Sequence, residues 1–327
     1  MIISRTPLRV SLAGGGTDVK SYYSKRDYGQ VISLGINKYI YVVIKKQSLL
    51  SDYKYKIRWS KSEDCNSITE IKHPIIRETL KYFKIQDPLE ISTFSDLPIS
   101  SGLGSSSTFL VGFINALLAH QNIQQTKGYI ADLAADIEIN ILKRVIGKQD
   151  HYAASYGGLN VITFFKKGNV NVEPVFYQKK ILEILEKKLV LLFTNQTRNA
   201  SKIIKNINFE EKFHELDYIR EQVQKFRNIF EGKLKISNFG ELLHNGWEFK
   251  KKLSPKSISN SKIDKIYNLA LKNGATGGKI CGAGGGGFLL LYSNDKKKLF
   301  KLLNKKNFLN FKFDNEGSRI TYFDNRY

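Results

Sequence analysis

The sequence predicts a mixed α/β fold in two parts, and three observations support this prediction. Strand-like segments, in which apolar and polar residues alternate, and helix-like segments, with apolar residues three and four apart, follow one another along all 327 residues. This length is sufficient for one large domain or for two ordinary domains with cores of their own. Hydrophobic residues make up 42% of the chain, the share expected of a globular protein rather than a disordered one.

Strands predominate in the first hundred residues. Residues 8–12 alternate apolar and polar side chains and predict a strand that leads into a glycine run. Similar alternation, or a compact apolar run, predicts further strands at 39–44, 53–59 and 89–93. The strand at 53–59 alternates apolar residues with lysine and arginine, so one of its faces is expected to be basic.

Two helices are expected next. Apolar residues in 109–118 recur three and four positions apart, which predicts a helix directly after the serines at 105–107. A second helix is expected over 126–146, with Thr126 as its N-cap. Its apolar face carries Glu138, and a carboxylate there is costly unless it is paired or binds a cation. Two interpretations remain open, namely metal contact and a position at the edge of the face, where Glu138 would reach water.

The chain is expected to divide near residue 180, into domains at 1–180 and 181–327. A strand at 159–165 precedes this boundary, and a hairpin with a connecting helix is expected over 166–188. Beyond the boundary the patterns predict strands at 189–193 and 288–292, helices at about 210–230, 239–253 and 261–272, and finally a helix and two short strands.

Charge and cysteine content limit the classes of partner. The chain has 52 Lys+Arg residues against 30 Asp+Glu, a net charge of +22, which favours anionic partners. Because many of the basic residues form short scattered pairs, with no zinc-finger spacing and no basic tail, we expect no nucleic acid partner. No apolar run reaches the length of a membrane span and no signal-peptide layout is present, so we expect no membrane partner. Cys65 and Cys281 are too few for a disulfide framework, and a cytoplasmic location is expected.

The most informative segment is 96–108, which reads Asp-Leu-Pro-Ile-Ser-Ser-Gly-Leu-Gly-Ser-Ser-Ser-Thr. Gly102 and Gly104 allow a tight turn and the close approach of a ligand. The helix start that follows presents N–H groups without intrahelical partners and the positive end of the helix dipole, which together favour a bound phosphate. A serine hydroxyl in this loop can also reach a bound Mg²⁺. An ordinary Ser-rich N-cap is the alternative, and further glycine loops at 14–18 and 282–287 weaken it.

Three glycine-rich motifs occur in order along the chain. They are Pro7-x-Arg9-x(4)-Gly14-Gly-Gly-Thr-Asp18, Pro98-x-Ser-Ser-Gly-Leu-Gly-Ser-Ser-Ser107 and Lys279-x-Cys-Gly-Ala-Gly-Gly-Gly-Gly-Phe288. Together they resemble the three signature motifs of the GHMP kinases, which include galactokinase, homoserine kinase, mevalonate kinase and phosphomevalonate kinase, and the similarity covers essentially the whole chain. Asn195-Gln-Thr-Arg198 and Gly277-Gly-Lys-Ile-Cys-Gly-Ala283 resemble one branch, the bacterial sugar 1-kinases that act on D-glycero-D-manno-heptose 7-phosphate. Fucokinase-type domains are the nearest competitors.

The resemblance implies a two-domain fold with the active site between the domains. The N-terminal domain would be ribosomal-protein-S5-domain-2-like and the C-terminal domain ferredoxin-like. The phosphates of ATP would lie on the serine loop, formed by Ser101, Gly102, Leu103, Gly104, Ser105, Ser106 and Ser107. Ser106 and Glu138 would be the protein ligands of Mg²⁺.

The resemblance also implies the residues that contact the sugar. Asp150 occupies the position of the family's catalytic aspartate, with Arg9 near the same centre. Sugar contacts are implied for Gly16, Thr17 and Asp18, and for Gly284 and Gly285 of the third loop, which would close over the substrate. Asp150 as a helix N-cap is the alternative. Two neighbours of these motifs are assigned no chemistry: His151, because adjacent residues on a helix point in different directions, and Cys281, which is interpreted as a packing residue.

The activity implied is transfer of the γ-phosphate of Mg-ATP to the anomeric (C1) hydroxyl of the heptose 7-phosphate. Asp150 would accept or orient the hydroxyl proton, and Lys148 or Arg9 would keep it ionised. The distal phosphate of the sugar needs a second cationic patch. Arg198 is the first candidate because Arg binds phosphate bidentately, and Lys202 would share its face of a helix, although a solvated pair is an equal alternative. A homodimer is left open.

Three other functions are weighed. A fucokinase-like or galactokinase-like enzyme would keep the same mechanism with a different sugar. A non-catalytic sugar-phosphate sensor would need neither Asp150 nor Glu138. A nucleotide-binding oxidoreductase is disfavoured, because 102–107 lacks the third glycine of the dinucleotide fingerprint.

Overall fold

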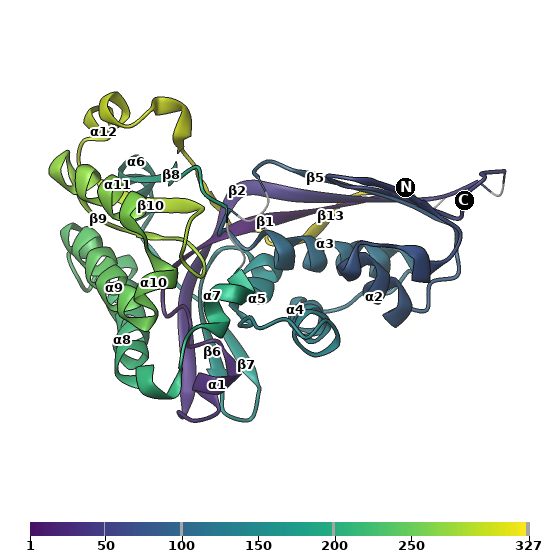
Figure 1. Ribbon diagram of the computed structural model, residues 1–327, viewed down its shortest axis with the longest axis horizontal. Coiled ribbons are helices and arrows are strands. Elements are labelled where there is room, and N and C mark those ends of the chain that lie inside the picture. The colour runs from purple at the N-terminus through teal and green to yellow at the C-terminus, as the bar shows by residue number, and fades with distance from the viewer. Residues whose placement is uncertain (49, 99–100, 198–199, 325–327) are drawn as a thin grey trace.

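The computed structural model describes residues 1–327 except 49, 99–100, 198–199 and 325–327. Within these residues the strands form two sheets, and helices cover the faces of both (Figure 1). The first sheet has nine strands among the described residues: β1 (Ile2–Ala13), β2 (Tyr28–Lys46), β3 (Tyr55–Arg58), β4 (Ser62–Cys65), β5 (Leu89–Ser95), β6 (Leu159–Phe165), β7 (Val170–Pro174), β12 (Phe313–Asp314) and β13 (Arg319–Phe323). The second has the antiparallel order β11-β8-β10-β9, formed by β8 (Leu189–Phe193), β9 (Ala275–Ile280), β10 (Phe288–Ser293) and β11 (Phe308–Leu309).

Strand β2 organises the first sheet. It pairs with β1 along one edge, while on the other edge its first residues pair with β6 and its last with β5. The end of the chain returns to this sheet, because β12 pairs with β2 and β13 pairs with β1. The division near residue 180 stays a prediction, and the strands at 313–323 complete the sheet that is built mainly from the first 180 residues.

The helices pack on these sheets as amphipathic or buried elements. They are α1 (Lys20–Tyr23), α2 (Pro74–Tyr82), α3 (Ser105–His120), α4 (Lys127–Asp136), α5 (Gln149–Tyr156), α6 (Lys179–Lys188), α7 (Ala200–Lys205), α8 (Phe213–Phe230), α9 (Phe239–Leu253), α10 (Pro255–Ile258), α11 (Ser261–Lys272) and α12 (Lys296–Leu302). Helices α2 to α5 lie on one face of the first sheet, α9 and α11 pack on β9 of the second, and α8 packs between α9 and the strands β1 and β2 (Figure 1).

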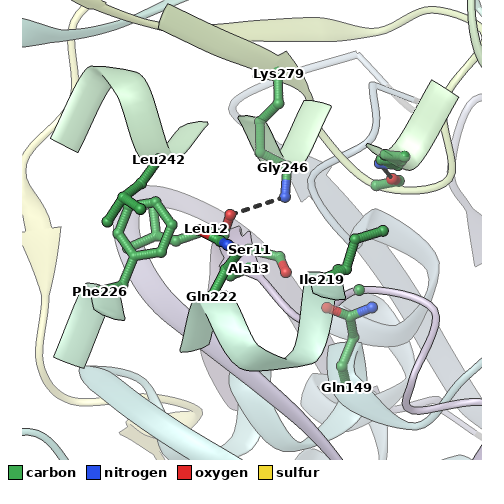
Figure 2. Close-up of a pocket in the computed structure, with 13 residues that line it drawn as sticks. Ser11, Leu12, Ala13, Gln149, Ile219, Gln222, Phe226, Leu242, Gly246 and Lys279 are labelled. Carbon is green, nitrogen blue, oxygen red and sulfur yellow. Dashed lines mark hydrogen bonds between the residues drawn. The ribbon is translucent and has the colours of Figure 1, made fainter. Parts of the chain in front are cut away.

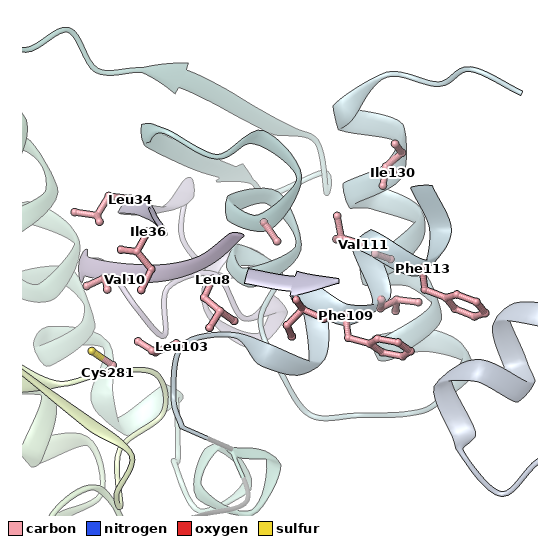
Figure 3. Packing of buried hydrophobic residues seen from close by; sticks show 14 of the residues in the cluster. Leu8, Val10, Leu34, Ile36, Leu103, Phe109, Val111, Phe113, Ile130 and Cys281 are labelled. Atoms are coloured by element: carbon pink, nitrogen blue, oxygen red, sulfur yellow. The ribbon is translucent and has the colours of Figure 1, made fainter. Parts of the chain in front are cut away.

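Helix α3 is apolar almost all round because it is enclosed. It contacts β1 and β2 on one side and α4 and α5 on the other. Phe109, Val111 and Phe113 lie beside Leu8 and Leu103 in this core (Figure 3). Cys281 is fully buried in the same cluster, where it packs as expected. Helix α3 is therefore fixed against the sheet, and its N-terminus is held in place.

The predicted elements are confirmed in most positions. The expected strands at 8–12, 39–44, 89–93, 159–165, 189–193 and 288–292 lie in β1, β2, β5, β6, β8 and β10, and the helices expected at 210–230, 239–253 and 261–272 are α8, α9 and α11. The strand expected at 53–59 is the shorter β3, and several elements were not predicted, among them α2, β4 and the first part of β2. Strand β9 was not predicted, because its glycine pair weakens the strand pattern. After α12 the described chain forms three short strands rather than two.

The helix expected over 126–146 is the main correction. Thr126 is its N-cap and accepts a hydrogen bond from the backbone N–H of Tyr129 at 3.1 Å, as predicted. However, α4 ends at Asp136, a π-helical segment spans Ile137–Ile141, and the chain then leaves the helix. Lys143 adopts the left-handed conformation, with φ of 53°, which ends the helix. Single π-turns of this kind often mark functional sites, and this one carries Glu138.

Candidate active site

The serine loop leads directly into helix α3. Gly104 is the residue before the helix and has a φ of 82°, and Gly102 has a φ of 88°. Both conformations favour glycine. The side-chain hydroxyls of Ser101 and Ser105 are buried without a hydrogen-bond partner among the described residues. The first turn of a helix also leaves N–H groups without intrahelical partners, so this loop offers several donors to an anion.

Glu138 lies beside this loop and is fully buried. Its Oε1 accepts a hydrogen bond from Ser106 Oγ at 2.6 Å, and its Oε2 accepts one from Ser107 Oγ at 2.7 Å. Two basic side chains complete its surroundings: Arg144 Nη1 lies 2.5 Å from Oε1, and His151 Nε2 lies 2.8 Å from Oε2. Burial, the largest influence, raises the pKa of this carboxyl, but His151, Arg144 and Ser106 together hold it at about 2. The interpretation in which Glu138 reaches water is therefore wrong.

Asp150 and Arg9 form the second charged pair. Arg9 is buried and donates from Nε to Asp150 Oδ1 at 2.7 Å, with Nη2 at 2.6 Å from the same oxygen. Its Nη1 donates to the backbone carbonyl of Gly102 at 2.8 Å. Arg9 therefore connects Asp150 to the serine loop. Lys148, the alternative partner of Asp150, donates instead to the carbonyl of Gly168 at 3.3 Å. Asp150 lies within the first turn of α5, whose N-cap is Lys148, so the N-cap interpretation is wrong.

Asp18 is a further acid of the cleft, and unlike Asp150 it is buried. Its carboxylate accepts hydrogen bonds from the backbone N–H and the side-chain amide of Gln149, both at 3.1 Å, and from the backbone N–H of Gly16 at 3.0 Å. Burial raises the pKa of Asp18, and the negative charge of Asp150 adds to this effect. Thr17 does not line the cleft, because it is fully buried and its hydroxyl bonds to backbone carbonyls.

These groups line one cleft of about 540 Å³. Its polar part contains the serine loop with Arg9, Asp18, Glu138 and Asp150. Its apolar part contains aromatic side chains: the rings of Trp59 and His73 lie 4.7 Å apart, and those of His73 and Phe109 lie 5.5 Å apart. Burial lowers the pKa of His73 to about 4, so this ring is neutral at physiological pH. The cleft can therefore hold an apolar ring at one end and charged groups at the other.

The third glycine loop closes one side of this cleft. Gly282 and Ala283 line it, whereas Gly284 and Gly285 pack against Ile258, whose carbonyl accepts a hydrogen bond from the Gly285 N–H at 2.7 Å. Arg198 lies outside the described residues. Helix α7, which begins shortly after it, contributes residues 200, 201 and 204 to the lining.

The third loop also touches the serine loop directly. Phe288 N–H donates to the Ser101 carbonyl at 2.9 Å, and a Cβ added to Gly287 would lie 2.2 Å from that oxygen. We expect Gly287→Ala to unfold at a lower temperature, because the left-handed conformation alone (φ of 81°) costs about 1–3 kcal/mol and the clash adds to it. Gly168→Ala is the matched control, since Gly168 has a φ of 95° in open space. Thermal unfolding that is the same for both variants would contradict the contact between the loops.

A small polar pocket adjoins the cleft (Figure 2). It shares Gln149 with the cleft, and its free volume of about 20 Å³ is enough for one water. The side chains of Ser11, Gln149 and Gln222, which line it, each carry a buried polar atom that has no hydrogen-bond partner in the part of the chain that the structure describes. Lys279 is also buried here and donates to the Leu12 carbonyl at 3.0 Å. A buried water is expected to complete this network.

The burial of Lys279 predicts a pH effect on stability. Burial lowers the pKa of Lys279 to about 8 from an ordinary value near 10.5, so the folded state binds fewer protons than the unfolded state between these values. This residue's contribution to the free energy of unfolding therefore rises with pH from 8 to 10.5. We expect the free energy of unfolding of Lys279→Met to exceed that of the wild type most below pH 8, and the difference between the two proteins to shrink toward pH 10.5. Denaturant titrations across this range test it, with exposed Lys262→Met as the control; a pH-independent difference would contradict it.

Ser106 and Glu138 carry the oxygen atoms that are candidate ligands for Mg²⁺. Among the described residues no group of three or more His, Cys, Asp and Glu side chains could hold a metal alone. Ser106 and Glu138 do present a hydroxyl and a carboxylate oxygen 2.6 Å apart beside the phosphate loop, and Mg²⁺ prefers oxygen ligands with the rest supplied by phosphates and water. The guanidinium of Arg144 already lies against both oxygens, so the position favours a cation. The residues therefore fit a magnesium ion that is shared with bound phosphates.

A cleft that combines a phosphate-binding loop with a carboxylate beside it that can orient an acceptor hydroxyl is typical of a phosphotransferase. Two family models match the chain: the GHMP kinases N terminal domain over residues 70–158 and the GHMP kinases C terminal domain over residues 219–306. The chain belongs to the GHMP kinases, and it is an ATP-dependent phosphotransferase that acts on an alcohol group.

Similarity to individual proteins supports this assignment. The chain is 33% identical to the D-glycero-alpha-D-manno-heptose 7-phosphate kinase of Campylobacter jejuni, with 97% of each chain covered. It is 28% identical to the mevalonate kinase of Methanocaldococcus jannaschii over 93% of this chain and 96% of the relative. A crystal structure of a D-glycero-D-manno-heptose 1-phosphate kinase from Bacteroides thetaiotaomicron superimposes with a TM-score of 0.79 at 25% identity, over 99% of this chain and all of that one. This establishes the two-domain GHMP kinase fold.

No helix in the described part of the chain has the length and apolar character needed to span a membrane.

The sequence does not predict the place of three residues in the site: Arg144, His151 and Gln149. His151 was set aside because it does not face Asp150, yet it contacts Glu138. Arg144 was expected inside a helix, and the π-turn and loop place it against Glu138 instead. Gln149 carries no sequence signal for its contact with Asp18, which depends on the meeting of β1 and α5.

Proposed function

We propose that the chain transfers the γ-phosphate of Mg-ATP to the anomeric hydroxyl of D-glycero-D-manno-heptose 7-phosphate. The product would be the 1,7-bisphosphate, a precursor of nucleotide-activated heptose for surface polysaccharide. The observation that supports this most is the bridge by Arg9, which binds Asp150 and the Gly102 carbonyl together. An acceptor hydroxyl at Asp150 would therefore lie beside phosphates held on the serine loop.

Each polar group of the cleft has a role in this proposal. Asp150 accepts or orients the proton of the anomeric hydroxyl, which is more acidic than an ordinary alcohol. Arg9 keeps Asp150 in place through its Nε and Nη2 groups, which both contact Asp150 Oδ1. Asp18, held by Gln149, binds hydroxyls of the sugar. Ser106 and Glu138 would hold Mg²⁺, which when bound neutralises charge on the phosphates.

The apolar end of the cleft is assigned to the nucleobase. Trp59, His73 and Phe109 form an aromatic cluster in the lining of the cleft. An adenine ring can pack there while its phosphates reach the loop, because a neutral His73 brings no repulsive or competing charge. The sugar then occupies the acidic end.

The choice of a phosphorylated heptose draws on the names of the relatives. One is named a heptose 7-phosphate kinase and a structural neighbour a heptose 1-phosphate kinase, so the position of the substrate's existing phosphate differs between these names. A free anomeric hydroxyl requires the 7-phosphate. Arg198, together with Lys202 of α7, remains the proposed contact for that distal phosphate.

The test is ADP release from Mg-ATP with a panel of acceptors. The panel contains sedoheptulose 7-phosphate with its isomerase, heptose 1-phosphate, mannose 6-phosphate, fucose, galactose and mevalonate. We expect turnover with the heptose 7-phosphate only. Turnover with fucose or galactose would identify a different sugar kinase of the same mechanism, and ATP binding without turnover would favour a sugar-phosphate sensor.

A further inference from the structure

Arg144 occupies the edge of the Ser106–Glu138 pair. Its Nη1 donates to Ser106 Oγ at 2.6 Å and lies 2.5 Å from Glu138 Oε1. Its backbone N–H donates to the Glu138 carbonyl at 3.0 Å, which fixes the loop that carries it. The Glu138 side chain is fully buried, whereas 31% of the Arg144 side chain is exposed, and both residues line the cleft. Arg144 therefore covers the carboxylate from the cleft side.

This arrangement conflicts with a metal ion on the same two oxygens. A cation bound by Ser106 Oγ and Glu138 Oε1 would compete with Nη1 for both of them. Like charges in a site of low dielectric repel strongly, so the guanidinium and the metal would not stay together there. Glu138 would keep its contact with His151 on its other oxygen, 2.8 Å away, during the exchange.

A guanidinium that is displaced from Ser106 and Glu138 also needs a new anionic partner. Its backbone is held beside Glu138, so the side chain stays within the cleft. The charge of Arg144 contributes to the lowered pKa of His73, which places Arg144 near the apolar end as well. A phosphate chain running from that end to the serine loop would pass Arg144, and Arg binds phosphate bidentately.

We propose that Arg144 is an exchangeable counter-cation: it holds Ser106 and Glu138 in place in the nucleotide-free protein and moves to the phosphate oxygens when Mg-ATP binds. This rests on the proposed use of Ser106 and Glu138 as metal ligands and does not depend on the identity of the sugar. Arg144 is a phosphate-binding residue in the loaded site and a positioning residue in the empty one.

The experiment measures two binding equilibria without the acceptor sugar. Mn²⁺ binding to the nucleotide-free protein is followed by electron paramagnetic resonance, and ATP binding in EDTA is followed by calorimetry. For Arg144→Ala we expect tighter Mn²⁺ binding, because the competing cation is gone, and about tenfold weaker binding of metal-free ATP, because a charged hydrogen-bond donor is lost. For Arg144→Lys we expect affinities for Mn²⁺ and for ATP that lie between those of the wild type and of Arg144→Ala.

Lys143→Ala is the control for net charge, since Lys143 is the exposed neighbour in the same loop. It should change neither equilibrium. Unchanged or weaker Mn²⁺ binding by Arg144→Ala in a folded variant would overturn the exchange, as would unchanged affinity for ATP. Failure of the heptose as a substrate would leave both measurements intact, so the two proposals fail separately.

Discussion

Replacing Asp150 by Asn is expected to lower kcat by about two to four orders of magnitude, the usual contribution of a positioned general base. The substitution keeps the size of the side chain and removes its charge. Arg9 would then lose the anionic partner of its Nε and Nη2 groups, although it would keep the Gly102 carbonyl. Steady-state kinetics with the heptose 7-phosphate measures the effect, and ATP affinity should change little because the phosphate loop stays intact.

Asp136→Asn is the matched control, because Asp136 is an exposed residue at the end of α4. It should retain wild-type turnover. If Asp150→Asn retained turnover within a few-fold of wild type, Asp150 would neither accept nor orient the proton, and the acceptor hydroxyl would have to bind elsewhere in the cleft.

Replacing Glu138 by Gln is expected to affect both stability and activity. The variant leaves Arg144 and His151 as basic groups around a neutral side chain, and removing one partner of a buried ionic cluster costs about 3–5 kcal/mol. Turnover should fall as well, since the proposed metal site loses its only carboxylate among the described residues. Chemical denaturation and Mg²⁺-dependent kinetics measure these two effects.

The effect of Glu138→Gln on the free energy of unfolding is expected to depend on pH. The folded pKa of Glu138, about 2, is below the unfolded value of 4.5, so the carboxylate contributes stability that is complete above pH 4.5 and lost as pH falls toward 2. The difference in unfolding free energy between wild type and Glu138→Gln should therefore shrink as pH falls through this range. Ser107→Ala, which removes one neutral donor to the same carboxylate, is the comparison and should show the same trend with pH at a much smaller amplitude. A constant difference for Glu138→Gln would contradict the ionic cluster.

Local patterns were sufficient for the parts of the fold that depend on periodicity. The apolar spacing of helix α3 and the glycines before it predict a phosphate loop, and the carboxylate on an apolar face leaves metal contact as one of two interpretations of Glu138. The bond between Ser106 and Glu138 joins the two features. The placement of Asp150 near Arg9 came from the resemblance to a family, not from spacing.

Features that depend on irregular backbone or on distant pairing were not predictable. Helical periodicity continues past Asp136, so nothing local indicates the π-turn that points Glu138 at the serines. Arg144 reaches Glu138 only because the chain leaves the helix after that turn. The return of β13 to β1 joins residues more than 300 positions apart, and such pairing is determined by the tertiary fold.

The central claim, phosphoryl transfer to the anomeric hydroxyl beside Asp150, is tested most directly by the position of the new phosphate. Phosphorus NMR of the product formed from Mg-ATP and heptose 7-phosphate should show a second phosphate coupled to the anomeric proton, and Asp150→Asn should form almost none of it. A phosphate on any other carbon of the sugar, or ADP released without a phosphorylated heptose, would contradict the account.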